Sequence, residues 1–383
     1  MTARYLIIIP AYNKPGWTTD YEKKTANELS KRHLVLVYRE YDKTSLKEIL
    51  FGKKFLRIKA EKKEENYYYS PIELLPFKRF KLMRKANSLI NVLISFLLFR
   101  INPFSYKLVI WGMQPEVADF ENDFPLKHVS LYDCVDYYDS LIKDHQIVIQ
   151  KQEGYIMKLF DLVVVNSRTL YSLHKEKRKD IHLVPLGFSP PGQKMVAKKI
   201  TQKKPIIVYI GAINYRLDFA LLRKLIENNR NWTFIFLGPV QKDIQDDILE
   251  IDDNIDRLLS LPNVIYGQSS DRDEVYRVVK QFDICIIPYN TDFDFNKYCF
   301  PMKLFEYFYM GKPVLSSPIN ELKYYQRFVK IGNTVKEWQR YIKELLEKSW
   351  PEDFRSKQKE IALDCTWNNK INVILNHLEA YKL

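Results

Sequence analysis

The sequence is poor in the features that mark several classes of protein. Its four cysteines lie far apart with no Cys-x-x-Cys pair, so neither a disulfide framework nor a zinc ribbon is expected. None of the 11 glycines forms a G-x-G-x-x-G or G-x-x-x-x-G-K-[ST] motif, which removes the main support for nicotinamide dehydrogenases and P-loop enzymes. H-E-x-x-H is also absent and the six histidines are scattered, so no metal site is expected.

The sequence also lacks a segment long and apolar enough to span a bilayer. Its first four residues lead directly into an apolar stretch at 5–9, without the apolar region and cleavage site of a signal peptide. A second apolar run, residues 88–99, is interrupted by Asn91 and Ser95 and falls short of the roughly 20 residues that a spanning helix requires. We therefore expect a reduced, cytoplasmic protein.

What is present indicates a folded α/β protein of two domains. Of the 383 residues, 46% are hydrophobic and 28% are charged, as in ordinary globular proteins. Short apolar runs alternate with helical stretches, which predicts βαβ units and parallel sheets. The expected strands are 5–9, 34–38, 107–111, 128–132, 162–166 and 181–185, then 206–210, 233–237, 263–266, 283–288 and 313–316.

A Pro-rich and basic stretch divides these two series of strands. We expect a first domain at 1–190, a linker at 191–204, a second domain at 205–351, and a helical segment at 352–383 that could pack on either domain. Ligands of open parallel sheets bind beyond the carboxyl ends of the strands, so two such sheets facing each other would form a cleft.

The positive charge is concentrated near the N-terminus. The net charge is +13, and residues 1–100 hold 21 Lys and Arg against 10 Asp and Glu. Residues 77–100 combine the apolar run with basic side chains and no acid, which predicts a helix lying on an anionic membrane surface, while the alternative is an ordinary core helix. The basic residues are Lys78, Arg79, Lys81, Arg84, Lys85 and Arg100.

The segment 301–314, PMKLFEYFYMGKPV, carries the clearest chemical signal. Pro301 suits the first turn of a helix, and Gly311 followed by a proline two residues later ends it, so a short helix is expected at about 301–310. Its N-terminus and Lys303 would form an anion site suited to a diphosphate. Glu306, on the same face, could accept two hydrogen bonds from a ribose diol, although a solvent-exposed Lys–Glu pair is the alternative.

The pattern P-x-K-x-x-E-Y-x-x-x-G-K-P-V closely resembles the donor-binding signature of GT-B glycosyltransferases that use nucleotide sugars. Further similarity lies in YIGAI at 209–213, LGP at 237–239, LPNV at 261–264 and DICIIPY at 283–289. The first half resembles this family through YDCVD at 132–136 and VVVNS at 163–167. The spread of these motifs is most similar to the bacterial glucuronosyltransferases of teichuronic acid and xanthan assembly.

This resemblance implies a GT-B fold, with two Rossmann-like domains facing across a cleft, and roles for several residues. The ribose would be bound by Glu306, and the diphosphate by Lys303 at the helix start formed by Pro301 and Met302. Gly211 would let the backbone approach the phosphates, and Tyr289 would complete the nucleotide site. Gly16 and Trp17, in the loop after the first strand, would lie near the acceptor.

Two further features bear on the chemistry. Retaining members carry a second glutamate eight residues before the ribose-binding one, whereas this sequence has Tyr298 there, which leaves the stereochemistry open. Asp133 and Asp136 follow the strand expected at 128–132, and Asp136 is the preferred general base for an inverting transfer. Their alternative role is to cap a helix.

The sequence thus predicts a metal-independent enzyme without cofactor. It would move a sugar from a UDP-linked donor to a lipid-linked or oligosaccharide acceptor at the inner membrane face, in bacterial surface polysaccharide synthesis. One alternative is a GT-A enzyme with Asp292 and Asp294 as its D-x-D metal site. Another is a non-catalytic protein that binds anionic lipid or nucleic acid, because Tyr67, Tyr68 and Tyr69 lie near Lys62 and Lys63. The intact signature argues against nucleic acid as a partner.

Overall fold

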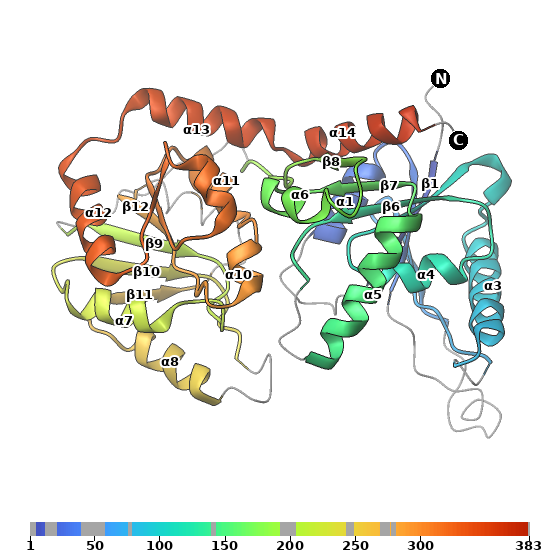
Figure 1. Cartoon of the computed structure of the whole chain (residues 1–383), viewed down its shortest axis with the longest axis horizontal. Helices are drawn as coiled ribbons and strands as arrows, with labels where there is room; N and C mark the ends of the chain where they lie inside the picture. The colour runs from blue at the N-terminus through green and yellow to red at the C-terminus, as the bar shows by residue number, and fades with distance from the viewer. Residues whose placement is uncertain are drawn as a thin grey trace. The chain divides into compact units, whose positions relative to one another are not determined.

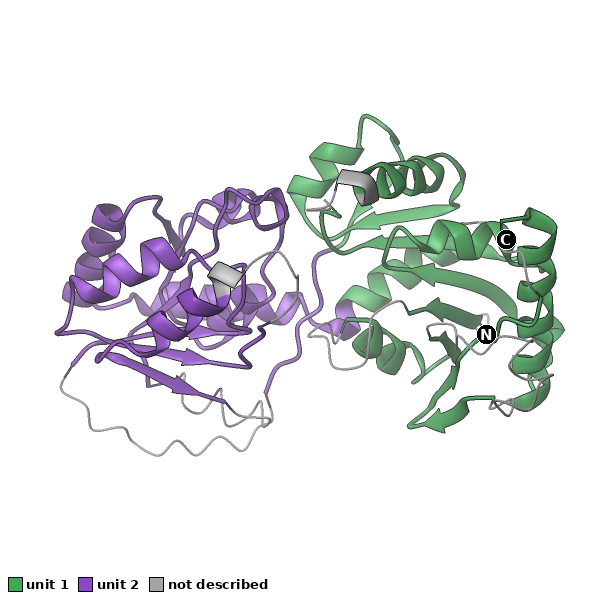
Figure 2. Ribbon diagram, turned by 90° about the horizontal axis from the view of Figure 1, so that it is seen from below, with its two compact units in different colours: residues 1–184, 370–383 green, residues 185–369 purple. Residues whose placement is uncertain are grey.

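The computed structural model describes residues 5–11, 21–39, 58–75, 79–138, 143–191, 204–242, 249–268, 276 and 281–381. The chain divides into two compact units (Figure 2). Unit 1 comprises residues 1–184 and 370–383, and unit 2 comprises residues 185–369. The segment expected to be helical at 352–383 contains two helices, and the boundary at residue 370 lies in the second of them.

Unit 1 is built on a sheet in the order β3-β4-β2-β1-β5-β6-β7-β8 (Figure 1). Every pairing is parallel except that of β3 with β4. Its strands are β1 (Tyr5–Pro10), β2 (Leu34–Tyr38), β3 (Ala60–Lys63), β4 (Asn66–Tyr69), β5 (Lys107–Gly112), β6 (Val129–Cys134), β7 (Leu162–Val165) and β8 (Ile181–Leu183). Its helices are α1 (Tyr21–Leu29), α3 (Lys81–Leu98), α4 (Val117–Asp123), α5 (Lys143–Leu159) and α6 (Arg168–His174), with a 3-10 turn η1 (Pro103–Ser105).

The central strands of unit 1 are apolar because both faces of the sheet are covered. Leu6 and Ile8 on one face of β1 join a core with Val92 and Phe96 of α3. All six residues of β1 are buried.

Unit 2 is a second α/β unit, built on a parallel sheet in the order β11-β10-β9-β12-β13-β14. Its strands are β9 (Ile206–Ile210), β10 (Thr233–Leu237), β11 (Val264–Gly267), β12 (Ile284–Ile287), β13 (Val314–Ser316) and β14 (Val329–Ile331). Its helices are α7 (Phe219–Glu227), α8 (Leu249–Leu259), α10 (Asp294–Tyr298), α11 (Lys303–Tyr309), α12 (Val335–Glu347) and α13 (Glu352–Asp364), with η2 (Asn320–Tyr325). The last helix, α14 (Trp367–Ala380), belongs to unit 1 from Lys370 onward.

Two predicted elements differ from the observed ones in ways that matter for the site. The strand expected at 128–132 is β6, which continues through Cys134 because Asp133 and Cys134 pair with Val164 and Val165 of β7. The helix expected at 301–310 is the shorter α11. It ends at Tyr309, two residues before Gly311, which adopts the left-handed conformation (φ +63°) that favours glycine after a helix.

In the part of the chain that the structure describes, no helix is long and apolar enough to cross a membrane.

Candidate active site

The carboxyl ends of the strands of unit 2 carry two glycines that bring neighbouring loops together. Gly211 follows β9 and Gly238 follows β10, with φ angles of +134° and +146°. The N–H of Gly211 donates to the carbonyl of Leu237 at 2.8 Å. A Cβ atom on Gly238 would lie 2.3 Å from the carbonyl oxygen of Gly211, so only glycine permits this approach.

Gly211 also leaves room for the signature lysine. A Cβ atom at Gly211 would lie 2.9 Å from Nζ of Lys303, the first residue of α11. Lys303 is buried and donates through Nζ to two phenol oxygens, that of Tyr209 at 2.9 Å and that of Tyr289 at 2.7 Å. The structure therefore brings Gly211 next to Lys303 and Tyr289, two residues that lie much later in the sequence.

Lys303 has an unusual electrostatic environment for a buried ammonium group. Within the described residues its hydrogen-bond partners are neutral phenols, and it forms no ion pair there. Burial lowers the pKa of Lys303, and the nearby positive charge of Arg216 lowers it further, while Tyr289 and the carboxylate of Glu306 offset part of this decrease. Because a buried charge is costly unless it is paired, such a lysine indicates a place where an anion binds.

Arg216, in the loop after β9, was not predicted as a site residue. Its guanidinium carbon lies 4.5 Å from the ring centre of Tyr289 and 4.7 Å from that of Phe295. Its Nε donates to the amide oxygen of the fully buried Asn296 at 2.8 Å. Two positive side chains, Lys303 and Arg216, therefore contact the same tyrosine. No local pattern marks Arg216, because its side chain is held by Tyr289 and by residues of α10, which are distant in the sequence.

The rest of the signature helix supports this arrangement. Tyr307 is fully buried, accepts a hydrogen bond from the N–H of Ile210 at 3.0 Å and donates to the carbonyl of Ile286 at 3.2 Å. These bonds fix α11 against the ends of β9 and β12. Glu306 is half-buried on the same helix.

The start of α11 is less open than the sequence predicts. Pro301 is buried and Met302 is half-buried, and both precede the helix. Their carbonyls accept the N–H groups of Leu304 at 3.0 Å and Phe305 at 3.2 Å. These two N–H groups are therefore already bonded within the helix start, which leaves the side chain of Lys303 as the stronger candidate for contact with an anion.

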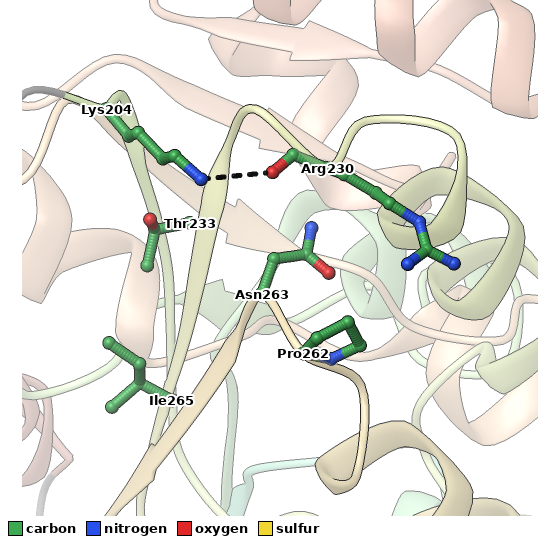
Figure 3. Close-up of a pocket in the computed structure, with 6 residues that line it drawn as sticks. All are labelled: Lys204, Arg230, Thr233, Pro262, Asn263 and Ile265. Carbon is green, nitrogen blue, oxygen red and sulfur yellow. Dashed lines mark hydrogen bonds between the residues drawn. The ribbon is translucent and has the colours of Figure 1, made fainter.

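A pocket of about 500 Å³ lies at the opposite, amino edge of the same sheet (Figure 3). Two of its polar side chains bond the backbone: the side-chain NH2 of Asn263 donates to three carbonyls, and Nζ of Lys204 donates to the carbonyl of Arg230. None of the predicted donor-site residues lines it. The candidate site is therefore the carboxyl edge, where Lys303 and Tyr289 meet. The pocket is lined by Lys204, Arg230, Thr233, Pro262, Asn263 and Ile265.

In unit 1 the two candidate aspartates lie in different environments. Side chains alternate along β6, so Tyr132 and Cys134 face the core beneath α5, whereas Asp133 faces α1 and α14. Asp133 is fully buried and accepts a hydrogen bond from Nζ of Lys370 at 2.9 Å. This contact argues for a positioning role for Asp133.

Asp136 lies beyond the end of β6 and is half-buried. Its Oδ1 accepts the N–H of Tyr137 at 3.2 Å. The segment is held from the other side by Tyr138, which donates to the carbonyl of Met113 at 2.6 Å after β5. Asp136 is therefore the better placed of the two aspartates to contact a substrate.

The structure does not assemble a site from the other residues predicted to take part, those of the first loop and of the D-x-D pair, within the part of the chain that it describes. Gly16 and Trp17 lie outside the described residues. Asp292 and Asp294 are exposed, and Asp294 lies 4.0 Å from Nζ of Lys297. Over the described ranges, no group of three or more His, Cys, Asp or Glu side chains is arranged to hold a metal ion.

The tyrosines proposed for nucleic-acid stacking belong to β4. Tyr69 is fully buried and donates to the amide oxygen of Asn91 at 2.7 Å. Tyr67 packs against Phe99, with 4.8 Å between ring centres. The ring of Tyr68 lies 4.4 Å from the guanidinium carbon of Arg39, and that of Tyr67 lies 5.5 Å from Nζ of Lys62. Tyr69 is therefore a core residue, whereas Tyr67 and Tyr68 pack beside basic side chains.

The sequence of the chain is similar to those of known glycosyltransferases. Residues 193–363 match the family model of glycosyl transferases group 1. The chain is 25% identical over 336 residues to a Bacillus subtilis (strain 168) protein provisionally named teichuronic acid biosynthesis glycosyltransferase TuaH, covering 81% of this chain and 82% of that protein.

Solved structures are similar over nearly the whole chain. Sucrose-phosphate synthase from Thermosynechococcus elongatus has a TM-score of 0.70 at 13% identity, covering 99% of this chain and 100% of that one. Anabaena HepE, solved in complex with UDP and glucose, has a TM-score of 0.64 at 14% identity, covering 97% and 99%. The predicted GT-B fold is confirmed, and the GT-A alternative is wrong.

Proposed function

Because the protein is a GT-B glycosyltransferase, we propose that it transfers a sugar from a UDP-linked donor to a hydroxyl of a lipid-linked glycan in bacterial surface polysaccharide synthesis. The observation that carries the donor assignment is the buried ammonium of Lys303 at the carboxyl edge of unit 2. A diphosphate would supply the negative charge that its two phenol partners lack. Glu306, one turn further along α11, would accept the ribose hydroxyls.

In the transfer step, the acceptor hydroxyl oxygen attacks the anomeric carbon of the donor sugar as the bond to the β-phosphate oxygen breaks. The electron pair of that bond leaves with the diphosphate, whose charge Lys303 and the donor site stabilise. In the inverting reaction that we propose, the hydroxyl proton passes to the carboxylate of Asp136. In this mechanism the transfer step needs no metal ion, because cationic side chains of the protein stabilise the negative charge of the leaving diphosphate.

We expect Glu306→Ala to weaken UDP binding by about 1.5 to 3 kcal/mol, because a carboxylate accepting ribose hydroxyls makes charge-assisted hydrogen bonds. Titration calorimetry with UDP, UMP and ribose-free uracil separates the contributions. The variant should lose affinity for UDP and UMP and keep its weak affinity for uracil. Unchanged UDP affinity in a folded variant would remove Glu306 from the site. Absence of UDP binding to the wild-type protein would contradict the proposed donor.

Helix α3 (Figure 1) supports association with a membrane, because part of its buried face is polar whereas its exposed face carries leucines. Polar side chains at four-residue intervals, Asn87, Asn91 and Ser95, face inward and are buried. Asn87 bonds the backbone of Leu74 and Leu75, and Asn91 bonds the backbone of Ile72 in the same way. The buried face of α3 is therefore attached to the rest of unit 1 partly by hydrogen bonds of its asparagines and not by apolar packing alone.

The outward face of α3 is apolar. Leu82, Leu89, Leu93 and Leu97 form one stripe along the helix, with exposed fractions of 71%, 43%, 52% and 77%. The exposed basic residues Arg79, Lys81, Lys85 and Arg100 lie near this stripe in sequence. An apolar stripe beside positive charge is suited to the interface of an anionic membrane, where a lipid-linked acceptor would be held.

We expect the triple change of Arg79, Lys81 and Lys85 to Gln to weaken binding to anionic vesicles roughly 100-fold, at about 1 kcal/mol for each charge. Arg84 is kept, because its Nε donates to Asp123 at 2.8 Å within the fold. The double change of Leu93 and Leu97 to Ser should remove the apolar contribution to vesicle binding, which persists at high salt. Cosedimentation with vesicles at several salt concentrations measures both effects.

The matched control replaces three exposed lysines of the same unit, Lys127, Lys175 and Lys179, by Gln. It removes the same charge and should retain vesicle binding. Equal loss in both triple variants would mean that net charge alone causes adsorption, and a wild-type protein that does not sediment with anionic vesicles at low salt would contradict the membrane proposal.

A further inference from the structure

The C-terminal helix places a charged side chain in the interior of unit 1. Nζ of Lys370, near the start of α14, lies 2.9 Å from Oδ1 of Asp133 in β6, and the two side chains are 1% and 0% exposed. The hydroxyl of Tyr21 lies 3.5 Å from Oδ2 of the same carboxylate, and the Tyr21 ring centre lies 5.3 Å from the ammonium. This buried group joins α14, α1 and the end of β6.

The pair is not required to attach the helix. Ile371, Ile374 and Leu378 of α14 are fully buried and already provide apolar packing. A buried ion pair often contributes no more stability than apolar residues of the same volume, because both charges lose their hydration. The ion pair instead orients the side chain of Asp133, because it holds the carboxylate at one defined position.

Asp133 begins the short segment that carries Asp136. The backbone at the beginning of this segment is held by the pairing of Asp133 and Cys134 with β7, and Lys370 adds a contact to the Asp133 side chain there. Beyond β6, contacts to the neighbouring strand ends hold the segment. The contacts are those of the Asn166 side-chain amide with the carbonyl of Val135 and of the Tyr138 hydroxyl with the carbonyl of Met113 at 2.6 Å.

We propose that Lys370 is a positioning residue for the transfer step, acting through Asp133 to hold the segment from which Asp136 contacts the acceptor hydroxyl. This inference rests on the proposed function of Asp136. Lys370 itself contacts no substrate. It lies 237 positions from Asp133 in the sequence and is the first residue of unit 1 after the whole of unit 2.

Lys370→Met is expected to lower kcat about 10- to 100-fold, because a displacement of about 1 Å in a reacting group has an effect of that size. The KM for the donor and the Kd for UDP should stay unchanged, since the donor site lies in unit 2. Leu378→Ala is the matched control: it opens a cavity in the same helix without touching Asp133. It should lower the melting temperature and keep kcat.

The decisive experiment repeats Lys370→Met in an Asp136→Asn background. If Lys370 acts through Asp136, the second change lowers kcat little further. Two results would overturn the inference while leaving the proposed function intact. One is that Lys370→Met lowers kcat by the same factor in the wild-type and Asp136→Asn backgrounds. The other is a normal kcat in folded Lys370→Met. Full activity of Asp136→Asn would instead overturn the role of Asp136. Should Lys370→Met fail to fold, Asp133→Asn is expected to show the same loss of kcat and serves in its place.

Discussion

Asp136→Asn is expected to bind UDP normally and to lose turnover by at least about 100-fold, the usual contribution of a positioned general base. The amide keeps the shape of the side chain and its bond to the N–H of Tyr137, so the fold should be preserved. It cannot accept the proton of the acceptor hydroxyl. Stopped-time assays of product together with calorimetry of UDP separate chemistry from binding.

The control for this variant is Asp180→Asn, at the amino edge of the same sheet. Asp180 precedes β8 and pairs with Arg178 at 2.7 Å, far along the strands from the proposed acceptor site. Its replacement should leave turnover unchanged. Near-normal turnover in Asp136→Asn would indicate another base or a retaining reaction in which the leaving phosphate takes the proton.

Lys303→Met is the second variant with a large expected effect. Removing one partner of a buried charge-assisted contact typically costs about 2 to 5 kcal/mol of binding free energy, so UDP affinity should fall by at least about 30-fold. Affinity for uridine, which has no phosphate, should change little. Equal losses for the two ligands would show that Lys303 supports the fold of the site rather than the diphosphate.

The same variant should not lose stability in the absence of ligand. Met fills a similar volume between Tyr209 and Tyr289 without burying a charge, so the melting temperature is expected to stay the same or rise. Lys312→Met is the matched control, because Lys312 is also buried but bonds the carbonyl of Phe282 at the amino edge of the sheet. That variant should lose stability and keep its UDP affinity.

The lowered pKa of Lys303 also has a consequence for pH dependence. Between its value in the folded protein and its ordinary value of 10.5, the unfolded chain binds more protons at this residue than the folded one. The contribution of Lys303 to stability therefore rises with pH across this interval. Denaturant titrations of the wild-type protein and Lys303→Met at several alkaline pH values should show this difference, and parallel curves would contradict it.

Most of the fold could be predicted because its central strands are short, apolar runs buried on both faces. β3, with the sequence Ala-Glu-Lys-Lys, was missed since all four residues are exposed at a sheet edge. β4 was missed because its three consecutive tyrosines are typical of a binding surface as well as of a strand. The short β14 has only one fully buried residue, Val329, and shows no apolar run.

Only those residues of the candidate donor site that belong to a local sequence motif could be predicted. Lys303 and Glu306 lie in one motif, and their neighbour Gly211 follows a recognisable strand. Arg216 and Lys370 acquire their roles from residues distant in the chain, Tyr289 and Asp133 respectively, so no local pattern marks them. The inward-facing asparagines of α3 show the same limit, since an apolar run normally predicts a buried face.

The most direct test of the account is the release of UDP from a panel of UDP-sugars by the wild-type protein and by Lys303→Met, measured in EDTA with and without a lipid-linked acceptor. We expect the wild-type protein to release UDP from at least one donor, faster with acceptor and despite the chelator, and Lys303→Met to be strongly impaired with the same donor. No release from any donor, or release that Lys303→Met retains in full, would contradict a nucleotide-sugar site at Lys303.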